Sequence, residues 1–491
     1  MTVLTERALK QQINEYVSGK LIYPTKIGRK PTLIHDSVHG TNSYQPHEMA
    51  MLDQPLLQRL RRISQTDVAN FVFPAGNHNR FEHTVGVTAI AGKMCEAVFA
   101  KNADLCNNYL YNPKFFINNC RFAAILHDCG HGPFSHQSEV VYGPLLDRVR
   151  VENPILANAA PHEILSYYIA TSKALRDFNK KVIKGMYDID IDLDLIAEMI
   201  VGYINPSRSK IFSFLVDIIN GAFDADKLDY LLRDAHSTGV MVALDIPRFM
   251  YTLDVVTDDE GSYRLAIDIS GVSELEEIIF NKMMLTSIVY HHQKVRAAGA
   301  VLKTIFEESK RFNDIEDYLN ATDDEIYTLS GESREVTALL DMLKTRNFPK
   351  RALCLSTKTV DEHEKVSEIA DKLKDKALQE RLKEKIVEDV YAKNKVEVPA
   401  ERIWIDIPSV PRFHEINDCF IQSGRNESIR LSDVSPTDKW VASFAESKWR
   451  SFMYTMEEYQ EVVARSALEV FEEEFGIHFN NMALLLCKID N

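Results

Sequence analysis

The stretch RFAAILHDCGHGPFSH at residues 121–136 decides how this part of the chain folds. Its apolar beginning predicts the last turns of a buried helix, and His127 and Asp128 follow directly. His131 comes four residues after His127, so we expect the two imidazoles to share a helix face. The glycines and proline at 130–133 then break the helix. The polar groups are therefore predicted to stand at an open helix end.

Histidines gather around this stretch. Five of them fall within sixty residues and a sixth follows soon after: His78, His83, His127, His131, His136 and His162. Imidazole together with carboxylate suits a borderline divalent cation such as Fe, Mn, Co, Ni or Zn. An isolated His-Asp pair is a weak signal, but a His-Asp pair combined with HxxxH and a Gly-Pro break is a stronger one. We interpret the cluster as a metal site used for chemistry.

A second motif, DADKLDYLLRD, lies at residues 224–234. On a helix, Asp226, Tyr230 and Asp234 form one stripe that carries two carboxylates and a phenol. Buried carboxylates are unfavourable unless they are paired or bind a metal. Lys227 follows Asp226 and can reach a phosphate. The alternative interpretation is an exposed, charged helix turn.

Apolar residues at helical spacing dominate residues 31–310, and the chain is predicted to be mostly α. We expect an N-terminal helix and connector (1–30), an all-helical domain (31–310) and a smaller α/β C-terminal lobe used for assembly or regulation (311–491). Local patterns predict further elements: a hairpin at 252–269, strands at 351–357 and 402–408, an exposed helix at 364–396 and an amphipathic helix at 456–475.

Composition restricts the class of protein. The net charge of −15 over 491 residues argues against nucleic acid as the main partner, because such binding needs basic surfaces. The seven cysteines include no CxxC pair, which predicts reduced thiols in a cytoplasmic protein. No apolar stretch approaches the roughly 20 residues that cross a bilayer, and the N-terminus lacks the apolar core of a signal peptide. We therefore expect no membrane association.

Taken in order, these motifs resemble the HD-domain superfamily, and within it the dNTP triphosphohydrolases. The similarity is greatest to the branch that joins a SAM domain to the HD domain, although some thirty residues precede the match here and no SAM domain is expected. The resemblance covers about residues 34–300 and rests on six motifs: DSVHG (36–40), DQPLLQRLRRISQ (53–65), FPAGNHNRFEHTVGV (73–87), HDCGHGPFSH (127–136), PHE (161–163) and DADKLDYLLRD (224–234).

The resemblance implies a metal-dependent reaction that releases intact triphosphate from a deoxynucleoside triphosphate. One divalent ion (Fe, Mn, Mg, Co, Ni or Zn) would be held by His83, His127, Asp128 and Asp226. Such an ion lowers the pKa of a bound water and polarises a phosphoryl oxygen. Arg80 and Lys227 match phosphate-contacting positions.

The same resemblance assigns catalytic and sugar-contacting residues. The catalytic or substrate-positioning set is His131, His136 and His162, with Asp224 and Glu163 as carboxylates that orient imidazoles. Of these, His136 is the predicted proton donor to the leaving oxygen and His131 orients water or phosphate. The predicted deoxyribose contacts are Gln65, Tyr230 and Asp234, which favour dNTPs over ribonucleotides. His291 and His292 stand where the family has a substrate-contacting Tyr-Gln pair, and Thr66 replaces an apolar neighbour of the sugar.

Asp53, Gln58 and Arg61 match a second site at which this branch binds an activating guanine nucleotide. A carboxylate can accept hydrogen bonds from guanine, and arginine can donate to its oxygen. The alternative is a helix start with Asp53 as N-cap and the other two on the solvent face. The regulatory interpretation implies activation by GTP or a dNTP and a homo-oligomer, either a dimer or a nucleotide-assembled tetramer.

Three functions follow from these patterns. The first is a dNTP triphosphohydrolase that sets deoxynucleotide levels or starves phage replication. The second is an HD phosphohydrolase for another substrate, such as a nucleoside monophosphate, a cyclic nucleotide or an alarmone. The third is a catalytically silent nucleotide sensor or nucleic-acid scaffold. Retention of all four ligand positions favours an enzyme, and the sugar-contacting trio favours dNTPs.

Overall fold

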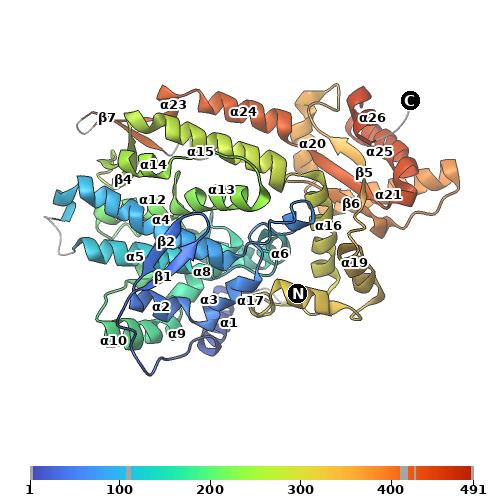
Figure 1. Cartoon of the computed structure of the whole chain (residues 1–491). Coiled ribbons are helices and arrows are strands. Elements are labelled where there is room, and N and C mark those ends of the chain that lie inside the picture. Colours follow the sequence, from blue (N-terminus) through green and yellow to red (C-terminus); the bar gives the residue numbers. More distant parts are fainter. Residues whose placement is uncertain (1–3, 107–111, 410–418, 425–426, 488–491) are drawn as a thin grey trace. The chain divides into compact units, whose positions relative to one another are not determined.

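The computed structural model describes residues 4–106, 112–409, 419–424 and 427–487, and it confirms the predicted mostly α class (Figure 1). The chain forms two compact units. The first contains residues 1–285, 309–332 and 413–437, and the second contains 286–308, 333–412 and 438–491. Each unit thus draws on three stretches of sequence. The domain boundaries expected near residues 30 and 310 stay predictions.

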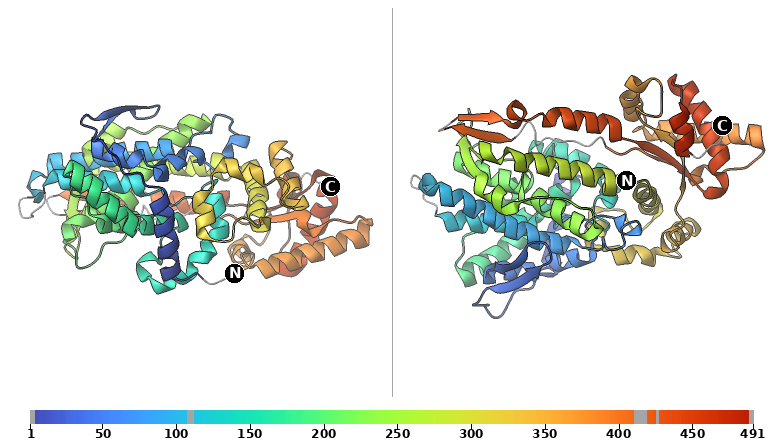
Figure 2. Two further views of the ribbon diagram at one scale, coloured as in Figure 1. Left: turned by 90° about the horizontal axis from the view of Figure 1, so that it is seen from below. Right: turned by 45° about the horizontal axis from the view of Figure 1, so that its top comes forward.

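The first unit is built around the long helix α4 (Arg80–Lys101), which packs against α5 (Pro113–Leu126) and α13 (Ala225–Thr238). Asn79 begins α4 by accepting hydrogen bonds from two first-turn amides. The surrounding helices include α8 (Pro161–Thr171), α11 (Leu193–Ile200) and α12 (Ser213–Asn220). Figure 2 shows α4 and α5 running side by side in both views.

Shorter elements of the first unit complete the frame around these helices. Before α4 lie α1 (Glu6–Gly19), α2 (Pro46–Leu52), α3 (Pro55–Gln58) and the 3-10 turn η1 (Arg59–Arg62). After α5 come α6 (His136–Tyr142), α14 (Ile246–Thr252), α15 (Val272–Leu285), α17 (Ile315–Asn320) and α18 (Asp323–Ile326). The helix predicted before residue 30 is thus present as α1.

Close approach of α4 and α13 requires a glycine. A Cβ placed on Gly86 would collide with the side chains of Asp229 and Arg233 on α13. These two side chains are fully buried and ion-paired to each other, and Arg233 also donates to Asp36 at the end of the first strand. The space opposite Gly86 therefore holds a buried charge network.

Two small sheets accompany the helices of the first unit. Strands β1 (Thr32–Asp36) and β2 (Gly40–Tyr44) form an antiparallel hairpin. The hairpin predicted at 252–269 is confirmed as β3 (Leu253–Thr257) and β4 (Tyr263–Asp268). A late segment extends it, because β7 (Phe420–Gly424) pairs parallel with β4 and antiparallel with β8 (Glu427–Arg430). These strands were not predicted.

The second unit has the order β5-β9-β6 in its sheet. The strands predicted at 351–357 and 402–408 are confirmed as β5 (Lys350–Leu355) and β6 (Ile403–Asp406), and β9 (Ser451–Thr455) lies between them. Its helices include α16 (Gln293–Glu308), α19 (Arg334–Lys344), α20 (Val366–Lys372), α21 (Lys376–Asn394), α24 (Thr437–Lys448), α25 (Gln460–Phe475) and α26 (Asn481–Cys487).

One helix prediction in this unit is wrong. The charged segment 364–396 was expected to be a single exposed helix, but it forms α20 and α21 with a break between them. Leu382, Ile386 and Val390 lie four residues apart on one side of α21 and are fully buried in the core of the second unit. The many charged residues therefore cover only the outer face of an amphipathic helix.

Within the described ranges, no helix is both long and apolar enough to cross a bilayer. The cysteines whose side chains are described show no disulfide, and the side chain of Cys106 lies outside them.

Candidate metal centre and active site

The end of α5 presents His127 and Asp128 to the centre of the first unit. The helix ends at Leu126, so the prediction that His127 and His131 share a helix face is wrong. His127 Nδ1 donates to the carbonyl of Ala124 at 2.7 Å, which leaves Nε2 as the free lone-pair nitrogen. The Nε2 atoms of His127 and His131 lie 3.4 and 3.3 Å from Asp128 Oδ1. The turn after α5 thus brings the two imidazoles to one carboxylate.

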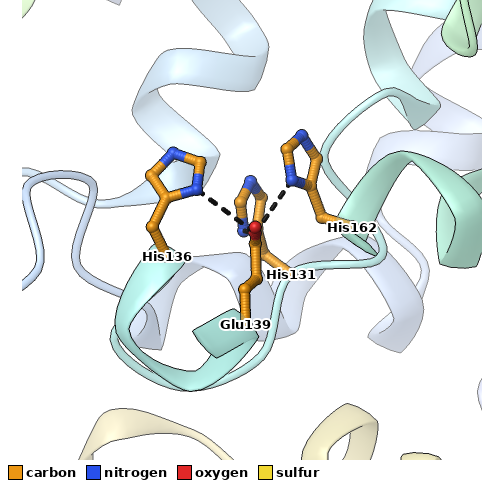
Figure 3. A group of neighbouring side chains, drawn as sticks. All are labelled: His131, His136, Glu139 and His162. Carbon is orange, nitrogen blue, oxygen red and sulfur yellow. Dashed lines mark hydrogen bonds and ion pairs between the residues drawn. The ribbon is translucent and has the colours of Figure 1, made fainter. Parts of the chain in front are cut away.

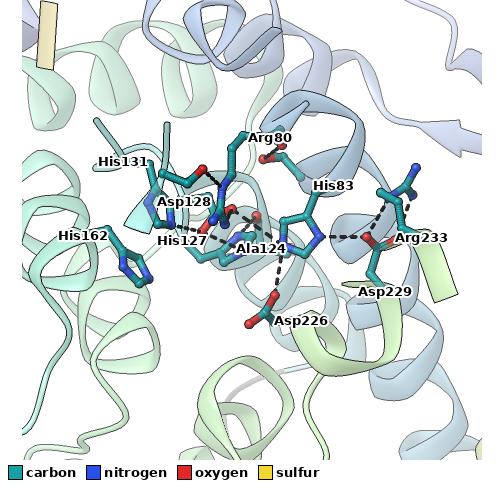
Figure 4. A network of polar contacts seen from close by, with 12 residues as sticks. Arg80, His83, Ala124, His127, Asp128, His131, His162, Asp226, Asp229 and Arg233 are labelled. Atoms are coloured by element: carbon teal, nitrogen blue, oxygen red, sulfur yellow. Dashed lines mark hydrogen bonds and ion pairs between the residues drawn. The ribbon is translucent and has the colours of Figure 1, made fainter. Parts of the chain in front are cut away.

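The four predicted metal ligands come together (Figure 4). His83 Nε2, from the first turn of α4, lies 2.9 Å from Asp226 Oδ1 and 3.6 Å from Asp128 Oδ2. Ligand atoms of His83, His127 and Asp128 all lie within 4.8 Å of one another. Three elements that are far apart in sequence therefore converge on one point.

The donor set fits a divalent cation. His83 Nε2 and His127 Nε2 are buried and make no hydrogen bond with any described residue, which is unfavourable for polar atoms in a core. The contact of His83 Nε2 with Asp226 Oδ1 at 2.9 Å is an ion-pair contact. Burial opposes protonation of His83, but the nearby carboxylates of Asp226 and Asp229 raise its pKa to about 10. A bound cation would take the place of that proton.

Asp229 orients the His83 ring and was missed by sequence reasoning. Its Oδ2 accepts a hydrogen bond from His83 Nδ1 at 2.7 Å, which turns Nε2 toward Asp226 and Asp128. The same carboxylate is held by Arg233 at 2.8 Å and by His39 Nε2 at 2.6 Å. This is the carboxylate–histidine–metal arrangement that fixes the tautomer of a ligand. The available signal was its position three residues after Asp226 on the same helix.

We expect Asp229→Asn to weaken Mn²⁺ binding by roughly 10- to 100-fold, because the amide holds the His83 ring less firmly and lowers its basicity. Calorimetric titration with Mn²⁺ measures the change. Asp217→Asn is the matched control, since Asp217 is also a carboxylate paired with an arginine, Arg264, away from these ligands. Equal metal affinity in the two variants would contradict the orienting role of Asp229.

A second cluster, which we call the histidine–glutamate cluster, contains His131, His136, Glu139 and His162 (Figure 3). Glu139 Oε1 lies 2.8, 3.0 and 3.3 Å from the Nδ1 atoms of His162, His131 and His136. The His131 and His162 rings stack with centroids 3.9 Å apart. All three predicted catalytic histidines therefore meet at one carboxylate. Glu139 was missed, although it follows His136 by one helical turn.

The histidines of this cluster differ in protonation. Burial, together with the charge of Arg80, lowers the pKa of His131 to about 3, so this ring is neutral at physiological pH. Burial also opposes a charge on His162, but the Glu139 carboxylate outweighs it and raises the pKa of His162 to about 9. One neutral and one protonated imidazole thus lie in contact, as general acid–base chemistry requires.

Asp224 and Glu163, predicted to orient imidazoles, contact other groups. Asp224 caps the N-terminus of α13 and accepts hydrogen bonds from the Lys227 amide at 2.8 Å and its Nζ at 2.5 Å. Glu163 accepts from the Ala160 amide at 2.7 Å and from Asn220 at 2.9 Å. Within the described part of the chain, neither accepts a hydrogen bond from an imidazole. Free helix amides compete for these carboxylates, and Glu139 and Asp229 take the predicted role.

Two cations border the candidate ligands. Arg80 is buried and donates to Asp128 Oδ2 and to Ser135 Oγ, both at 2.8 Å. Its Nη2 lies 3.4 Å from His136 Nε2, so Arg80 bridges the metal ligands and the histidine–glutamate cluster. Lys227 Nζ donates to the Gly221 carbonyl at 2.9 Å in addition to Asp224. Both positive charges lie where a polyphosphate could be bound beside the ion.

The predicted sugar contacts are linked through His78. His78 Nε2 lies 2.7 Å from Asp234 Oδ1, and the His78 carbonyl accepts from the Gln65 amide at 3.0 Å. Gln65 Oε1 is buried without a hydrogen-bond partner among the described residues. Tyr230 lies on α13 between Asp226 and Asp234 at one-turn spacing. His78 belongs to the same motif as Arg80, but its role had not been predicted.

The predicted activator residues lie near one another at α2, α3 and η1. Arg61 Nε donates to Gln58 Oε1 at 2.8 Å, and the Arg61 guanidinium lies 3.8 Å above the ring of Phe81. The N-cap alternative for Asp53 is wrong, because Asp53 ends α2 and Gln54 is the residue that precedes α3. Binding of a nucleotide by Asp53, Gln58 and Arg61 stays a prediction.

His291 and His292 lie in the second unit, after a short π-helix (η9, Thr286–Tyr290) and before α16. Burial lowers the pKa of His291 to about 4. Their contact with substrate stays a prediction.

Comparison with known proteins gives two family matches. Residues 80–231 match the HD domain, and residues 244–475 match the HD associated region. The first range begins at Arg80 and includes all four candidate metal ligands.

Several curated proteins are similar to the chain. An uncharacterized protein of Methanocaldococcus jannaschii is 27% identical over 87% of this chain and 79% of its own length. The deoxynucleoside triphosphate triphosphohydrolase SAMHD1 homolog of Dictyostelium discoideum is 28% identical over 63% of this chain and 55% of its own length. The SAMHD1 protein of Homo sapiens is 27% identical over 59% and 45%, respectively. The chain therefore spans about half the length of these SAMHD1 relatives.

Proposed function

We propose that this HD-domain protein, whose candidate metal ligands all fall within residues 80–231, is a metal-dependent phosphohydrolase that cleaves dNTPs to a deoxynucleoside and triphosphate. The observation that carries the proposal is the meeting of His83, His127 and Asp128, with Asp226 in contact with His83. The Nε2 atoms of both histidines are buried and have no hydrogen-bond partner among the described residues. The similarity to enzymes named deoxynucleoside triphosphate triphosphohydrolases supports the choice of substrate.

The reaction breaks the bond between the 5′ oxygen and the α-phosphorus, and a water oxygen forms the new bond to that phosphorus. His83, His127, Asp128 and Asp226 would hold a divalent ion, which would supply Lewis-acid polarisation and make a water more acidic. Arg80, and Lys227 with it, would hold the phosphates beside the ion. The leaving 5′ oxygen would take a proton from the histidine–glutamate cluster. His136, which faces Arg80, is the proposed donor, and His162, whose pKa is about 9, would hold a proton that can replace the one donated.

Discrimination of the sugar is assigned to Gln65, Tyr230 and Asp234. The Asp234 carboxylate, held by His78 at 2.7 Å, would accept from the 3′-hydroxyl together with Gln65. The Tyr230 ring would exclude a 2′-hydroxyl. This arrangement favours dNTPs over ribonucleotides.

Product analysis tests the proposed function. Mn-loaded protein is incubated with the four dNTPs together, with each singly, and with the four ribonucleotides. Deoxynucleoside plus intact triphosphate is the expected result. Release of phosphate or diphosphate would indicate another phosphohydrolase, and no turnover with metal bound would favour a nucleotide sensor.

The same assay tests activation. Asp53, Gln58 and Arg61 would bind a guanine nucleotide, and the hydrogen bond between Gln58 and Arg61 supports this assignment because it holds both side chains together. We expect the mixture of dNTPs to be hydrolysed without further addition. A dNTP supplied singly should be hydrolysed only after GTP is added. Sedimentation with and without nucleotide tests the associated homo-oligomer, dimer or tetramer. Full activity with each dNTP alone would contradict the activator site.

We expect kcat to fall as pH rises through about 9, because the pKa of His162 is raised by Glu139 and its proton is lost above that value. Glu139→Gln removes the negative partner, so the fall should move to lower pH, where burial disfavours the charged ring. Measurement of kcat between about pH 6 and 9.5 checks this. Glu152→Gln, which changes an exposed glutamate paired with Arg148, should leave the profile unchanged. An unshifted profile in Glu139→Gln would contradict the assignment.

A further inference from the structure

The turn that leads into the histidine–glutamate cluster has an unfavourable backbone. Phe134 and Ser135 have φ angles of +51° and +49°, in the left-handed region that residues with a Cβ rarely adopt. Two such residues in succession persist only where neighbouring groups hold them. His136, the first residue of α6, follows immediately.

Ser135 connects this turn to the metal ligands. Its hydroxyl accepts a hydrogen bond from Arg80 Nε at 2.8 Å and donates to the Ser64 carbonyl at 2.5 Å. Arg80 in turn donates to Asp128. The conformation at Ser135 therefore decides where the Arg80 guanidinium lies between Asp128 and His136.

Asp323, which lies 189 residues after Phe134, holds the turn by a hydrogen bond to its backbone. Its Oδ1 accepts from the Phe134 amide at 2.6 Å, and its Oδ2 accepts from the Ser64 amide at 2.8 Å and the Ser64 hydroxyl at 2.6 Å. Both carboxylate oxygens are thus used, one by Phe134 and the other by Ser64. Burial raises the pKa of Asp323 to about 6, against the effect of these hydrogen bonds.

The segment around Asp323 makes two further contacts with the same region. The buried Arg59 guanidinium donates to the Ala321 carbonyl at 3.2 Å and to the His131 carbonyl at 2.6 Å. The ring of Tyr327 lies edge-on to Phe134, with centroids 6.2 Å apart. Segment 321–327 is therefore anchored at three points to the loop that carries the catalytic histidines.

We propose that Asp323 is a positioning residue for the active site, which locks the Phe134–Ser135 turn and thereby places Arg80 and His136 for the reaction. Asp323 touches no predicted substrate group and acts through Ser64 and Phe134. The catalytic consequence of this inference rests on the proposed phosphohydrolase function. The contacts by which Asp323 holds the turn, which we call the lock, are present in the protein without substrate.

Asp323→Asn is the decisive variant. The amide keeps the size of the side chain, but its NH₂ group replaces one acceptor oxygen. A donor then faces the N–H of Phe134 or of Ser64, which loses its hydrogen bond. We expect kcat for dNTP hydrolysis to fall by about 10- to 100-fold, because small misplacement of reacting groups has effects of this size. Mn²⁺ affinity should change by less than about threefold, since Asp323 hydrogen-bonds to no predicted metal ligand.

Hydrogen exchange gives a readout that does not depend on activity. In Asp323→Asn, the amide of Phe134 should exchange at least about tenfold faster, measured by mass spectrometry on peptides spanning 130–142. Asp314→Ala is the control from the same stretch of the first unit (309–332), because Asp314 caps α17 and its side chain accepts from the Asp317 amide. It should leave both kcat and exchange at Phe134 as in the unmodified protein.

The outcomes separate the two ideas. Unchanged exchange at Phe134, unchanged kcat, or a loss of kcat that only parallels lost metal would each overturn the role of Asp323. Absence of dNTP turnover by the unmodified protein would overturn the proposed function instead, and faster exchange in Asp323→Asn would then still support the lock.

Discussion

Asp128→Ala is expected to abolish dNTP hydrolysis, with a loss of about 10³-fold or more in kcat. Asp128 lies at a junction of the site, since Oδ1 faces His127 and His131 while Oδ2 faces His83 and Arg80. Metal ions contribute several kcal/mol to stabilisation of a phosphoryl-transfer transition state, and each 1.4 kcal/mol is a factor of ten in rate. Removal of this carboxylate also leaves Arg80 buried without its ion pair.

The assay measures released triphosphate and bound Mn in the same samples. Asp128→Asn, which keeps the size of the side chain but not its charge, should also lose metal. Asp147→Ala, an equal charge change at a residue whose side chain is 72% exposed, should keep full activity. A metal-free Asp128→Ala that still releases triphosphate would overturn the metal-dependent mechanism.

Arg233→Ala is expected to destabilise the protein by about 3–5 kcal/mol, because it removes the arginine that is ion-paired with two buried carboxylates. The Arg233 side chain is 2% exposed and binds Asp229 at 2.8 Å and Asp36 at 2.6 Å, whose side chains are 0% and 4% exposed. Arg233→Lys should recover only part of the loss, since an ammonium group cannot reproduce the two-pronged contact.

Urea unfolding of the metal-free protein, followed by circular dichroism, measures this change. Arg176→Ala is the matched control, because Arg176 also pairs with an aspartate, Asp194, but the two side chains are 44% and 55% exposed. Exposed pairs contribute about 1 kcal/mol or less, so this variant should unfold almost normally. Similar losses in both variants would mean that burial of the Arg233 network has no special effect. Because Asp229 orients His83, Arg233→Ala should also weaken Mn²⁺ binding.

Local sequence determined several of the elements. The helix that leads to His127 ends before the Gly-Pro stretch at 130–133, and the turn residues near Asp258 make a hairpin, because both depend on short-range backbone preferences. The mostly α class follows from apolar periodicity in the same way. The metal set of a His-Asp pair, a preceding His and a distant Asp was instead implied by the resemblance to the HD superfamily.

Tertiary packing decided which carboxylate accepts a hydrogen bond from which imidazole. Along α13 the acidic residues Asp224, Asp226, Asp229 and Asp234 are all available, and the direction of each depends on how the helix is rotated against α4. Asp224 is occupied by the amides at its own helix end, whereas Asp229 reaches His83 because Gly86 leaves room for it. Sequence spacing does not encode that rotation.

The meeting of distant segments was equally inaccessible from the sequence. Glu139 reaches His162 across 23 residues, β7 pairs with β4, and Asp323 holds Phe134 across 189 residues. Such contacts depend on the packing of the whole unit rather than on any local preference of the chain. The sequence alone thus determined the mostly α class, several elements and the side chains available for chemistry. Only the tertiary structure decided which groups meet, because the burial that brings them together is a property of the folded chain.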